Sequence, residues 1–440
     1  MATPPRKLHF NVHVSFGSNH EAAWRLPDAA SADLTHFEAH RQVAVTAERG
    51  KLDAVFYGDQ PMLYSSIGYR PSEQLDPIAL QGALSVATSH IGLAVTASTS
   101  FNEPFNLARK LLSLDHLSKG RIGWNIVTTN SDNAARNFGL DDRLAHAERY
   151  RRAEEFVQVV TRLWDSWLPG AVVNDKTNGV YADLTKIRQI NHQGKYFKVL
   201  GPLNLPPSPQ GRPVLIQAGS SETGIAFAAR HADAVFTAQD TLAGAQSYYR
   251  RIREQAARSG RNPDNLRVMV GLSPILAGTE AEAQRLAKDL EELIVPEAGL
   301  RQIRHFTGVD LSGYPLDKPV PLEAFPALDN IEGHRSRATI ILESSKRENL
   351  TVRQLIGRLA GARGHQTLVG SVEQVADRIA EWFENGAADG FNYMPAVLPQ
   401  GLDAFVDGVI PILRQRGLFR YEYEGSTLRE HYGLPAHIQK

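Results

Sequence analysis

Polar side chains follow several apolar runs of this sequence, at the point where each run ends. In the stretch GRIGWNIVTTNSDN, Ile122, Trp124 and Ile126 surround Asn125 and lead into a group of threonine and asparagine residues. A buried polar cluster must be hydrogen-bonded within the protein or must hold a ligand. The polar residues at such run ends are Asp59, Thr96, Ser98, Asn125, Ser220, Ser221, Gln239 and Asp240. One such end needs no function, whereas their repetition indicates a ligand site.

The segment QAGSSETG has the composition of an anion-binding helix start. Gly219 allows close approach of a ligand, while Ser220 and Ser221 offer hydroxyl and amide groups where the helix dipole favours a phosphate. Capping of the helix by a serine would explain the same residues. A second helix start carries His146 and Tyr150, which are four residues apart and share a face. Both of these side chains can donate hydrogen bonds to phosphate oxygens.

Histidines occur in two further patterns. His9, Asn11 and His13 alternate with apolar residues in LHFNVHV, so they share one face of an expected strand. That face either lines the interior near the ligand site or points outward. His36 and His40 are four residues apart but lack the glutamate of an HExxH motif, and we expect no metal site.

The elements that must position these residues are short apolar runs alternating with amphipathic helical patterns. Strand-like runs begin near residues 7, 53, 91, 121, 213, 233, 267 and 388. Eight strands alternating with helices predict an α/β fold with a parallel sheet, most simply a TIM (β/α)8 barrel. A doubly wound sheet is the alternative, although no GxGxxG follows the first strand. In a TIM barrel the active site lies at the C-terminal ends of the strands, where the polar residues fall. Trp124 is expected in the core.

Two segments interrupt the alternation. We expect a single domain over residues 1–440 with insertions at about 166–212 and 295–365. The first is rich in proline, glycine and asparagine and shows no strong period. The second also contains many glycines and prolines, and we expect an irregular lid over the site.

The composition is that of an ordinary globular protein. Hydrophobic residues make up 42% of the chain, and 48 basic residues balance 48 acidic ones. The net charge of zero argues against nucleic acid or an anionic membrane as the main partner. The absence of cysteine excludes disulfides, thiolate metal sites and cysteine nucleophiles. Because no apolar run has the length of a membrane span and no signal region is evident, we expect a cytoplasmic protein.

Four long segments carry a family resemblance, namely TSHIGLAVTASTSFNEPFNLARKLLSLDHLSKGRIGWNIVTTNSDNAARNFG, HAERYRRAEEFVQVVTRLWDSW, INHQGKYFKVLGPLNLPPSPQGRPVLIQAGSSETG and ADGFNYMPAVLP. They resemble the bacterial-luciferase-like flavin monooxygenases, and specifically the branch of the nitrilotriacetate, EDTA, dibenzothiophene-sulfone and long-chain alkane monooxygenases. The start of the chain, NVHVSFGSNHEAAW, does not align with the cysteine and histidine of the alkane enzyme. This departure argues against alkane hydroxylation.

The resemblance implies a two-component enzyme. Such a protein takes reduced FMN (FMNH2) from a separate NAD(P)H:flavin oxidoreductase and uses O2 to oxidise a small organic substrate. For this chain we expect cleavage of a C–N or C–S bond in an aminopolycarboxylate or organosulfur compound, and a homodimer or homotetramer. The flavin-contacting positions of the family fall on Asp59, Thr96, Asn125, His146, Tyr150, Ser220 and Ser221. His13 and Asn125 are the expected catalytic residues.

Two alternatives stay open at this point. One is a deazaflavin-dependent oxidoreductase of the same superfamily, and the other is a non-catalytic flavin-binding protein. No dinucleotide-binding fingerprint follows any expected strand, so direct use of NADH or NADPH is not expected.

Overall fold

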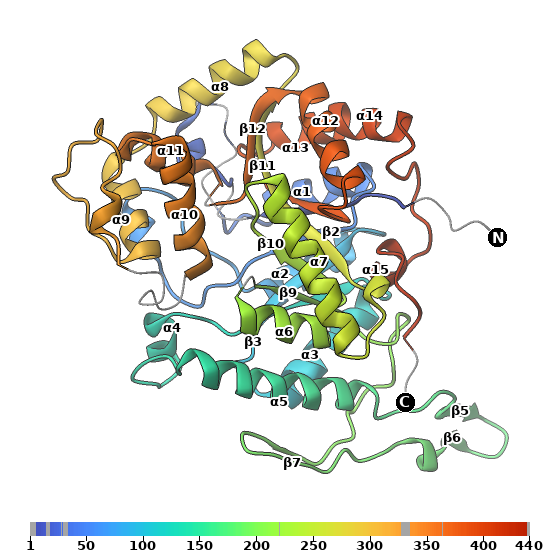
Figure 1. Cartoon of the computed structure of the whole chain (residues 1–440). Coiled ribbons are helices and arrows are strands. Elements are labelled where there is room, and N and C mark those ends of the chain that lie inside the picture. Colours follow the sequence, from blue (N-terminus) through green and yellow to red (C-terminus); the bar gives the residue numbers. More distant parts are fainter. Residues whose placement is uncertain are drawn as a thin grey trace.

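Eight parallel strands form a closed barrel in this computed structural model, with helices on the outside (Figure 1). The structure describes residues 6–14, 18–27, 29, 34–219, 221–326, 335–362 and 364–437. The barrel strands are β1 (His9–Val14), β2 (Ala54–Tyr57), β3 (Gly92–Ser98), β4 (Ile122–Val127), β9 (Val214–Ala218), β10 (Ala234–Thr237), β11 (Arg267–Ala277) and β13 (Gly390–Tyr393). They follow this order around the ring, and β13 closes it by pairing with β1. The predicted TIM barrel is therefore confirmed, and the doubly wound alternative is wrong.

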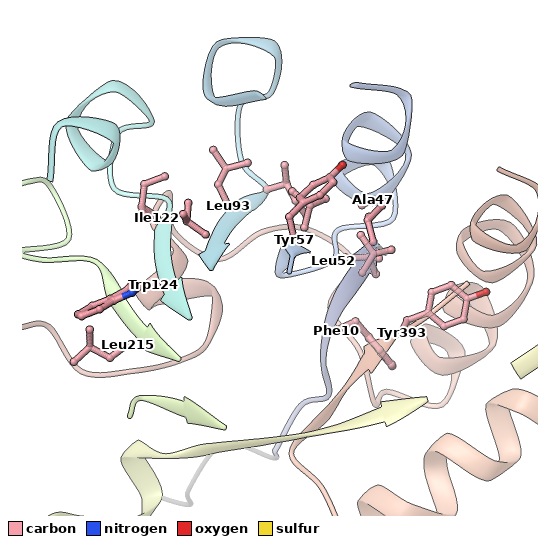
Figure 2. Packing of buried hydrophobic residues seen from close by; sticks show 14 of the residues in the cluster. Phe10, Ala47, Leu52, Tyr57, Leu93, Ile122, Trp124, Leu215 and Tyr393 are labelled. Carbon is pink, nitrogen blue, oxygen red and sulfur yellow. The ribbon is translucent and has the colours of Figure 1, made fainter. Parts of the chain in front are cut away.

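A ring of helices covers the outer face of the barrel. It consists of α1 (Phe37–Arg49), α2 (Pro77–Ala87), α3 (Pro104–Leu117), α5 (His146–Trp164), α6 (Glu222–His231), α7 (Leu242–Arg258), α8 (Glu280–Glu292), α12 (Val372–Glu384), α13 (Gln400–Ala404) and α14 (Ile410–Gln415). Outward-facing apolar side chains of the strands pack against these helices, as Figure 2 shows for Ile122, Trp124 and Leu215. Trp124 is fully buried, and its Nε1 donates a hydrogen bond to Ala97 O at 3.1 Å. The prediction that Trp124 lies in the core is confirmed.

The last helix of the chain closes the N-terminal end of the barrel. This helix, α15 (Leu428–His431), places Leu428 in a buried cluster with Phe56 and Tyr432 inside the barrel. Gly92 of β3 makes room for it, because a Cβ at that position would lie 2.5 Å from Leu428 Cδ1. Apolar packing therefore fills this end, and the polar strand ends lie at the other one.

The insertion at 166–212 contains more regular structure than expected. It forms the antiparallel pair β5 (Val172–Asp175) and β6 (Val180–Ala182), the short turn η3 (Leu184–Lys186) and the pair β7 (His192–Gln193) and β8 (Lys198–Val199). These hairpins project from the barrel below α5 in Figure 1.

The expectation that the insertion at 295–365 is irregular is wrong, while its role as a lid stays a prediction. The described part of this insertion is largely helical, with α9 (Pro296–Thr307), α10 (Arg335–Glu348) and α11 (Val352–Ala362), while residues 327–334 lie outside the described residues. The three helices bury an apolar cluster of their own that includes Ile303, Ile341 and Leu355. They lie on the left in Figure 1, whereas α15 lies on the right. A ninth strand, β12 (Gln366–Ser371), follows these helices and pairs with the C-terminal half of β11.

No helix within the described ranges combines the length and the apolar character that a membrane span requires.

Candidate active site

The polar residue near the end of the buried strand β4 faces the interior of the barrel. Side chains alternate along a strand, so Asn125 faces the barrel interior while Trp124 packs outward. Asn125 Nδ2 donates to Thr96 Oγ1 on β3 at 2.9 Å, and the Thr96 hydroxyl in turn donates to Tyr57 O at 2.7 Å. Asn125 Oδ1 is buried and has no hydrogen-bond partner among the described residues. The strands thus hold the amide in place and leave one acceptor for a ligand.

Other polar residues of the same mouth bond to each other. Thr129 Oγ1 donates to Ser98 Oγ at 2.7 Å, so these two hydroxyls are satisfied within the loops. Gln239 Nε2 donates to Thr237 Oγ1 at 3.0 Å. Asp240 forms an ion pair with Arg347 of α10 at 2.9 Å, which ties β10 to the helical insertion. These strand ends therefore contribute to structure.

The start of α6 has the features of a phosphate site. Ser221 is the N-cap residue, and its Oγ accepts a hydrogen bond from Gly224 N at 3.1 Å. A Cβ at Gly224 would lie 3.0 Å from Ser221 Oγ and 3.1 Å from Tyr150 OH, so both hydroxyls crowd the same point. Tyr248 OH donates to Gly219 O at 3.1 Å and fixes the loop before the helix. Ser220, the other predicted serine, lies outside the described residues.

The start of α5 supplies the aromatic side of this site. Burial raises the pKa of Tyr150, while hydrogen bonds with Ser221 and Thr128 act in the opposite direction. The ring of His146 lies 4.9 Å from that of Tyr150, as the four-residue spacing predicts. Burial lowers the pKa of His146, and the charge of Arg149 adds to this effect. Tyr150 is thus a neutral hydroxyl donor beside the α6 start.

Asp59 follows β2 in the same mouth. Burial and the nearby Asp76 raise the pKa of Asp59 to about 6. The buried Gln60 Oε1 and Asn130 Oδ1 also have no hydrogen-bond partner in the described part of the chain. Unpaired buried acceptors and a carboxyl group that resists ionisation are typical of a site built for a ligand.

The alternating residues of β1 lie in the barrel interior at three different depths. His9 Nδ1 lies 3.2 Å from Asp53 Oδ1 at the N-terminal end. Asn11 Nδ2 donates to Asn392 Oδ1 at 2.6 Å at mid-height. His13 lies toward the C-terminal end, with its ring 5.7 Å from that of Phe236. Of the three, only His13 lies near the polar mouth.

His36 and His40 occupy positions that contribute to the structure of α1 and its surroundings. His40 Nδ1 lies 3.1 Å from Tyr57 OH and Nε2 lies 2.9 Å from Leu34 O, so both ring nitrogens have partners. His36 is the exposed N-cap residue of α1. The described residues contain no group of three acidic or histidine side chains that could hold a metal ion.

Sequence reasoning missed a cavity of about 580 Å³ above the barrel mouth. Its walls come from η1 (Ala23–Arg25), the loops after β2 and β4, and α9. The charged residues of its lining are Arg25, Arg70, Arg143, Arg301, Glu21 and Asp132. None of them lies at a strand end, so the pattern that located the other site residues could not mark them.

The family of the chain follows from a comparison with known proteins. Residues 11–389 match the family described as luciferase-like monooxygenase. The chain therefore belongs to the luciferase-like monooxygenase family.

Two curated relatives match over almost the whole chain. N-acetyl-S-(2-succino)cysteine monooxygenase of Bacillus subtilis (strain 168) is 45% identical and covers 100% of this chain and 99% of its own length. Nitrilotriacetate monooxygenase component A of Aminobacter aminovorans is 43% identical over 98% of this chain and 97% of its own length. The predicted resemblance to the branch of the nitrilotriacetate, EDTA and dibenzothiophene-sulfone monooxygenases is confirmed.

A solved structure shares the fold closely. Riboflavin lyase, in a crystal structure with modified FMN and the substrate riboflavin, superposes with a TM-score of 0.86 at 33% identity. The match covers 99% of this chain and 98% of that chain.

Proposed function

We propose that this chain is an FMNH2- and O2-dependent monooxygenase that oxidises a small organic substrate at a C–N or C–S bond. The observation that carries the proposal is the C-terminal mouth of the barrel. There the buried amide oxygen of Asn125, which has no partner among the described residues, faces the same opening as the serine-capped start of α6. The relatives described above are themselves monooxygenases, and the riboflavin lyase structure contains modified FMN.

The residues of the mouth fit a bound flavin mononucleotide. Tyr150 and Ser221 would hold the phosphate together with the first amides of α6, whose dipole favours an anion. Ser220 and His146 would complete this group. Asn125, positioned by Thr96, would contact the edge of the isoalloxazine ring, and Asp59 would approach it from β2. When bound, reduced FMN supplies the activation of O2, and the protein orients the reactants and excludes water.

His13 is the proposed proton carrier of the site. Its ring packs against those of Phe56 and Phe236, at centroid distances of 5.3 and 5.7 Å. An imidazole can accept a proton at one ring nitrogen and donate one from the other. His13 and Asn125 are thus the proposed catalytic residues, one for protons and one for orientation of the flavin.

The proposed substrates are aminopolycarboxylates or organosulfur compounds. One relative is named for a thioether acid and another for nitrilotriacetate, an amine with several carboxylates. The nitrilotriacetate enzyme is named as a component A, which supports the proposal that reduced FMN comes from a separate NAD(P)H:flavin oxidoreductase.

Photochemically reduced FMN tests the proposal without a reductase. The purified chain, given FMNH2, O2 and a panel of aminopolycarboxylates, sulfones and thioether amino acids, should form product when neither NADH nor NADPH is present. NADH oxidation coupled to product formation by the chain alone would contradict the two-component assignment. Tight binding of a deazaflavin with none of FMN would favour the deazaflavin oxidoreductase, and flavin binding with no product from any substrate would favour a carrier.

A further inference from the structure

The cavity above the barrel mouth is positioned to hold the substrate. Gln60 and Asn130 belong to its lining and lie in the loops that continue β2 and β4, beyond Asp59 and Asn125. Its volume of about 580 Å³ falls within the range of small-molecule sites. A molecule in this cavity would therefore lie next to the proposed flavin position.

Positive charge dominates the cavity lining. Among the described lining residues, four arginines face two carboxylates, which leaves an excess of two positive charges on a chain whose net charge is zero. Arg70 lies 3.4 Å from Glu21, and Arg143 pairs with Asp132. Each of the two carboxylates thus has an arginine partner within the protein.

The other two arginines have no carboxylate partner in the described part of the chain. Arg25 donates a hydrogen bond to Leu293 O, a neutral acceptor. Arg301 lies over the ring of Tyr69, with its guanidinium carbon 5.1 Å from the ring centroid. Neither guanidinium forms an ion pair with any residue that the structure describes, so each retains donors for an anionic ligand.

The rest of the wall combines apolar and aromatic side chains with polar ones. Trp24, Met62, Tyr64 and Phe306 line the cavity beside the arginines. Trp24 Nε1 donates to Tyr69 O at 3.2 Å, which joins the η1 segment to the loop after β2. Such a wall suits a short organic skeleton whose acid groups reach the arginines, because guanidinium groups bind carboxylates with paired hydrogen bonds.

We infer that the substrate is a small organic diacid, and that Arg25 and Arg301 bind its two carboxylate groups. That the bound diacid is the substrate rests on the proposed function, whereas the charge preference of the cavity does not. Among the proposed substrates, we expect compounds with at least two carboxylates to be favoured over sulfones and other neutral organosulfur compounds.

Equilibrium binding to the full chain saturated with FMN tests the inference. Two matched pairs serve as probes, thiodiglycolate with its diamide and iminodiacetate with its diamide. In at least one pair the diacid should bind tenfold or more tightly than the diamide. Raising the ionic strength should weaken binding of the diacid but not that of the diamide. Equal affinities within both pairs would overturn the inference.

Three variants locate the effect. Arg25→Gln and Arg301→Gln should each weaken diacid binding about tenfold and leave the diamide unchanged. Arg304→Gln is the matched control, because Arg304 lies on the same helix but pairs with Asp310 outside the cavity. An equal loss of diacid affinity in Arg304→Gln, or no loss in either cavity variant, would contradict the assignment.

These measurements use neither O2 nor reduced flavin, so their outcome is independent of turnover. A diacid preference without product in the photochemical assay would contradict the proposed function alone. Turnover of neutral substrates with no preference for diacids would contradict the inference alone.

Discussion

The two ends of the barrel hold a carboxylate in opposite ways. At the N-terminal end, Asp53 is fully buried and forms an ion pair with Arg420, a contact with His9 and a hydrogen bond from Phe10 N. Burial alone would raise the pKa of Asp53, but these partners lower it below its usual value. The C-terminal segment of the chain supplies Arg420 and seals this end.

The C-terminal end contains polar groups that the protein leaves incomplete. Asn125 Oδ1 has no hydrogen-bond partner within the described chain, and Asp59 has a pKa raised to about 6. Arg25 and Arg301 have no carboxylate partner there either. A buried carboxylate with partners stabilises the fold, whereas buried groups without partners cost stability and leave donors and acceptors for ligands. The presence or absence of such partners therefore distinguishes residues that stabilise the fold from residues that form the site.

The largest expected effect comes from breaking the buried ion pair between Asp53 and Arg420. Asp53→Asn leaves the buried Arg420 without its carboxylate, and we expect the free energy of unfolding to fall by about 3–5 kcal/mol. Chemical denaturation measures this change. Folded protein should still bind FMN with wild-type affinity, and a specific loss of FMN affinity without loss of stability would contradict the division between the two ends. The exposed pair Asp317–Arg353 provides the control, since Asp317→Asn should leave stability essentially unchanged.

The second effect concerns the phosphate site at the other end. Tyr150→Phe removes a hydroxyl that would donate to the FMN phosphate, a charge-assisted hydrogen bond that contributes about 1.5–3 kcal/mol. The dissociation constant of FMN should therefore rise roughly tenfold to a hundredfold. Tyr249→Phe is the matched control, because Tyr249 OH bonds to Asp389 away from α6. An unchanged dissociation constant in Tyr150→Phe would remove Tyr150 from the site.

The third effect is a gain in stability. The pKa of Asp59 is raised from 3.8 to about 6 in the folded protein, so the folded state binds this proton more tightly than the unfolded state. Stability contributed by the group is therefore lost as pH rises from about 4 to about 6. Asp59→Asn should raise the free energy of unfolding of the apoprotein by about 2 kcal/mol at pH 8. The gain should disappear below about pH 4, and a gain that is independent of pH would argue against a strained carboxylate.

The variant Asn125→Leu should have the smallest effect on stability and should change the products of flavin oxidation. Asn125→Leu keeps the Thr96 hydroxyl bonded to Tyr57 O, so the free energy of unfolding should change by less than about 1 kcal/mol. The loss of the amide should misorient the flavin, and more hydrogen peroxide should form for each flavin oxidised. Measurement of peroxide and product in single turnovers tests this. If the variant forms as much product for each flavin oxidised as the wild type does, Asn125 has only a structural role.

The barrel itself could be predicted from the sequence because its signal is local. Each parallel strand is an apolar run buried on both faces and followed by an amphipathic helix, as β4 and α5 illustrate. Because the active site of a TIM barrel lies at the C-terminal ends of its strands, Asn125, Thr96 and Asp59 could then be placed at one mouth. The helical insertion was missed although α9 begins with Pro296 at its first turn and ends at Gly308 in the left-handed region, a pairing that marks helix boundaries.

The cavity could not be predicted in the same way. Its unpaired arginines come from η1 and α9, segments far apart in sequence that meet only through tertiary packing. Charged residues in loops and helices are ordinary surface residues until the fold shows which of them have partners. Likewise, Asp240 matched the strand-end pattern, but its ion pair with Arg347 gives it a structural environment that only the folded chain reveals.

A crystal structure of the chain with FMN tests the central claim most directly. We expect density for the phosphate against Ser221 and Tyr150 at the start of α6, and for the isoalloxazine edge within hydrogen-bond distance of Asn125 Oδ1. Flavin bound outside the C-terminal mouth of the barrel, or bound there with Asn125 Oδ1 still lacking a partner, would contradict it.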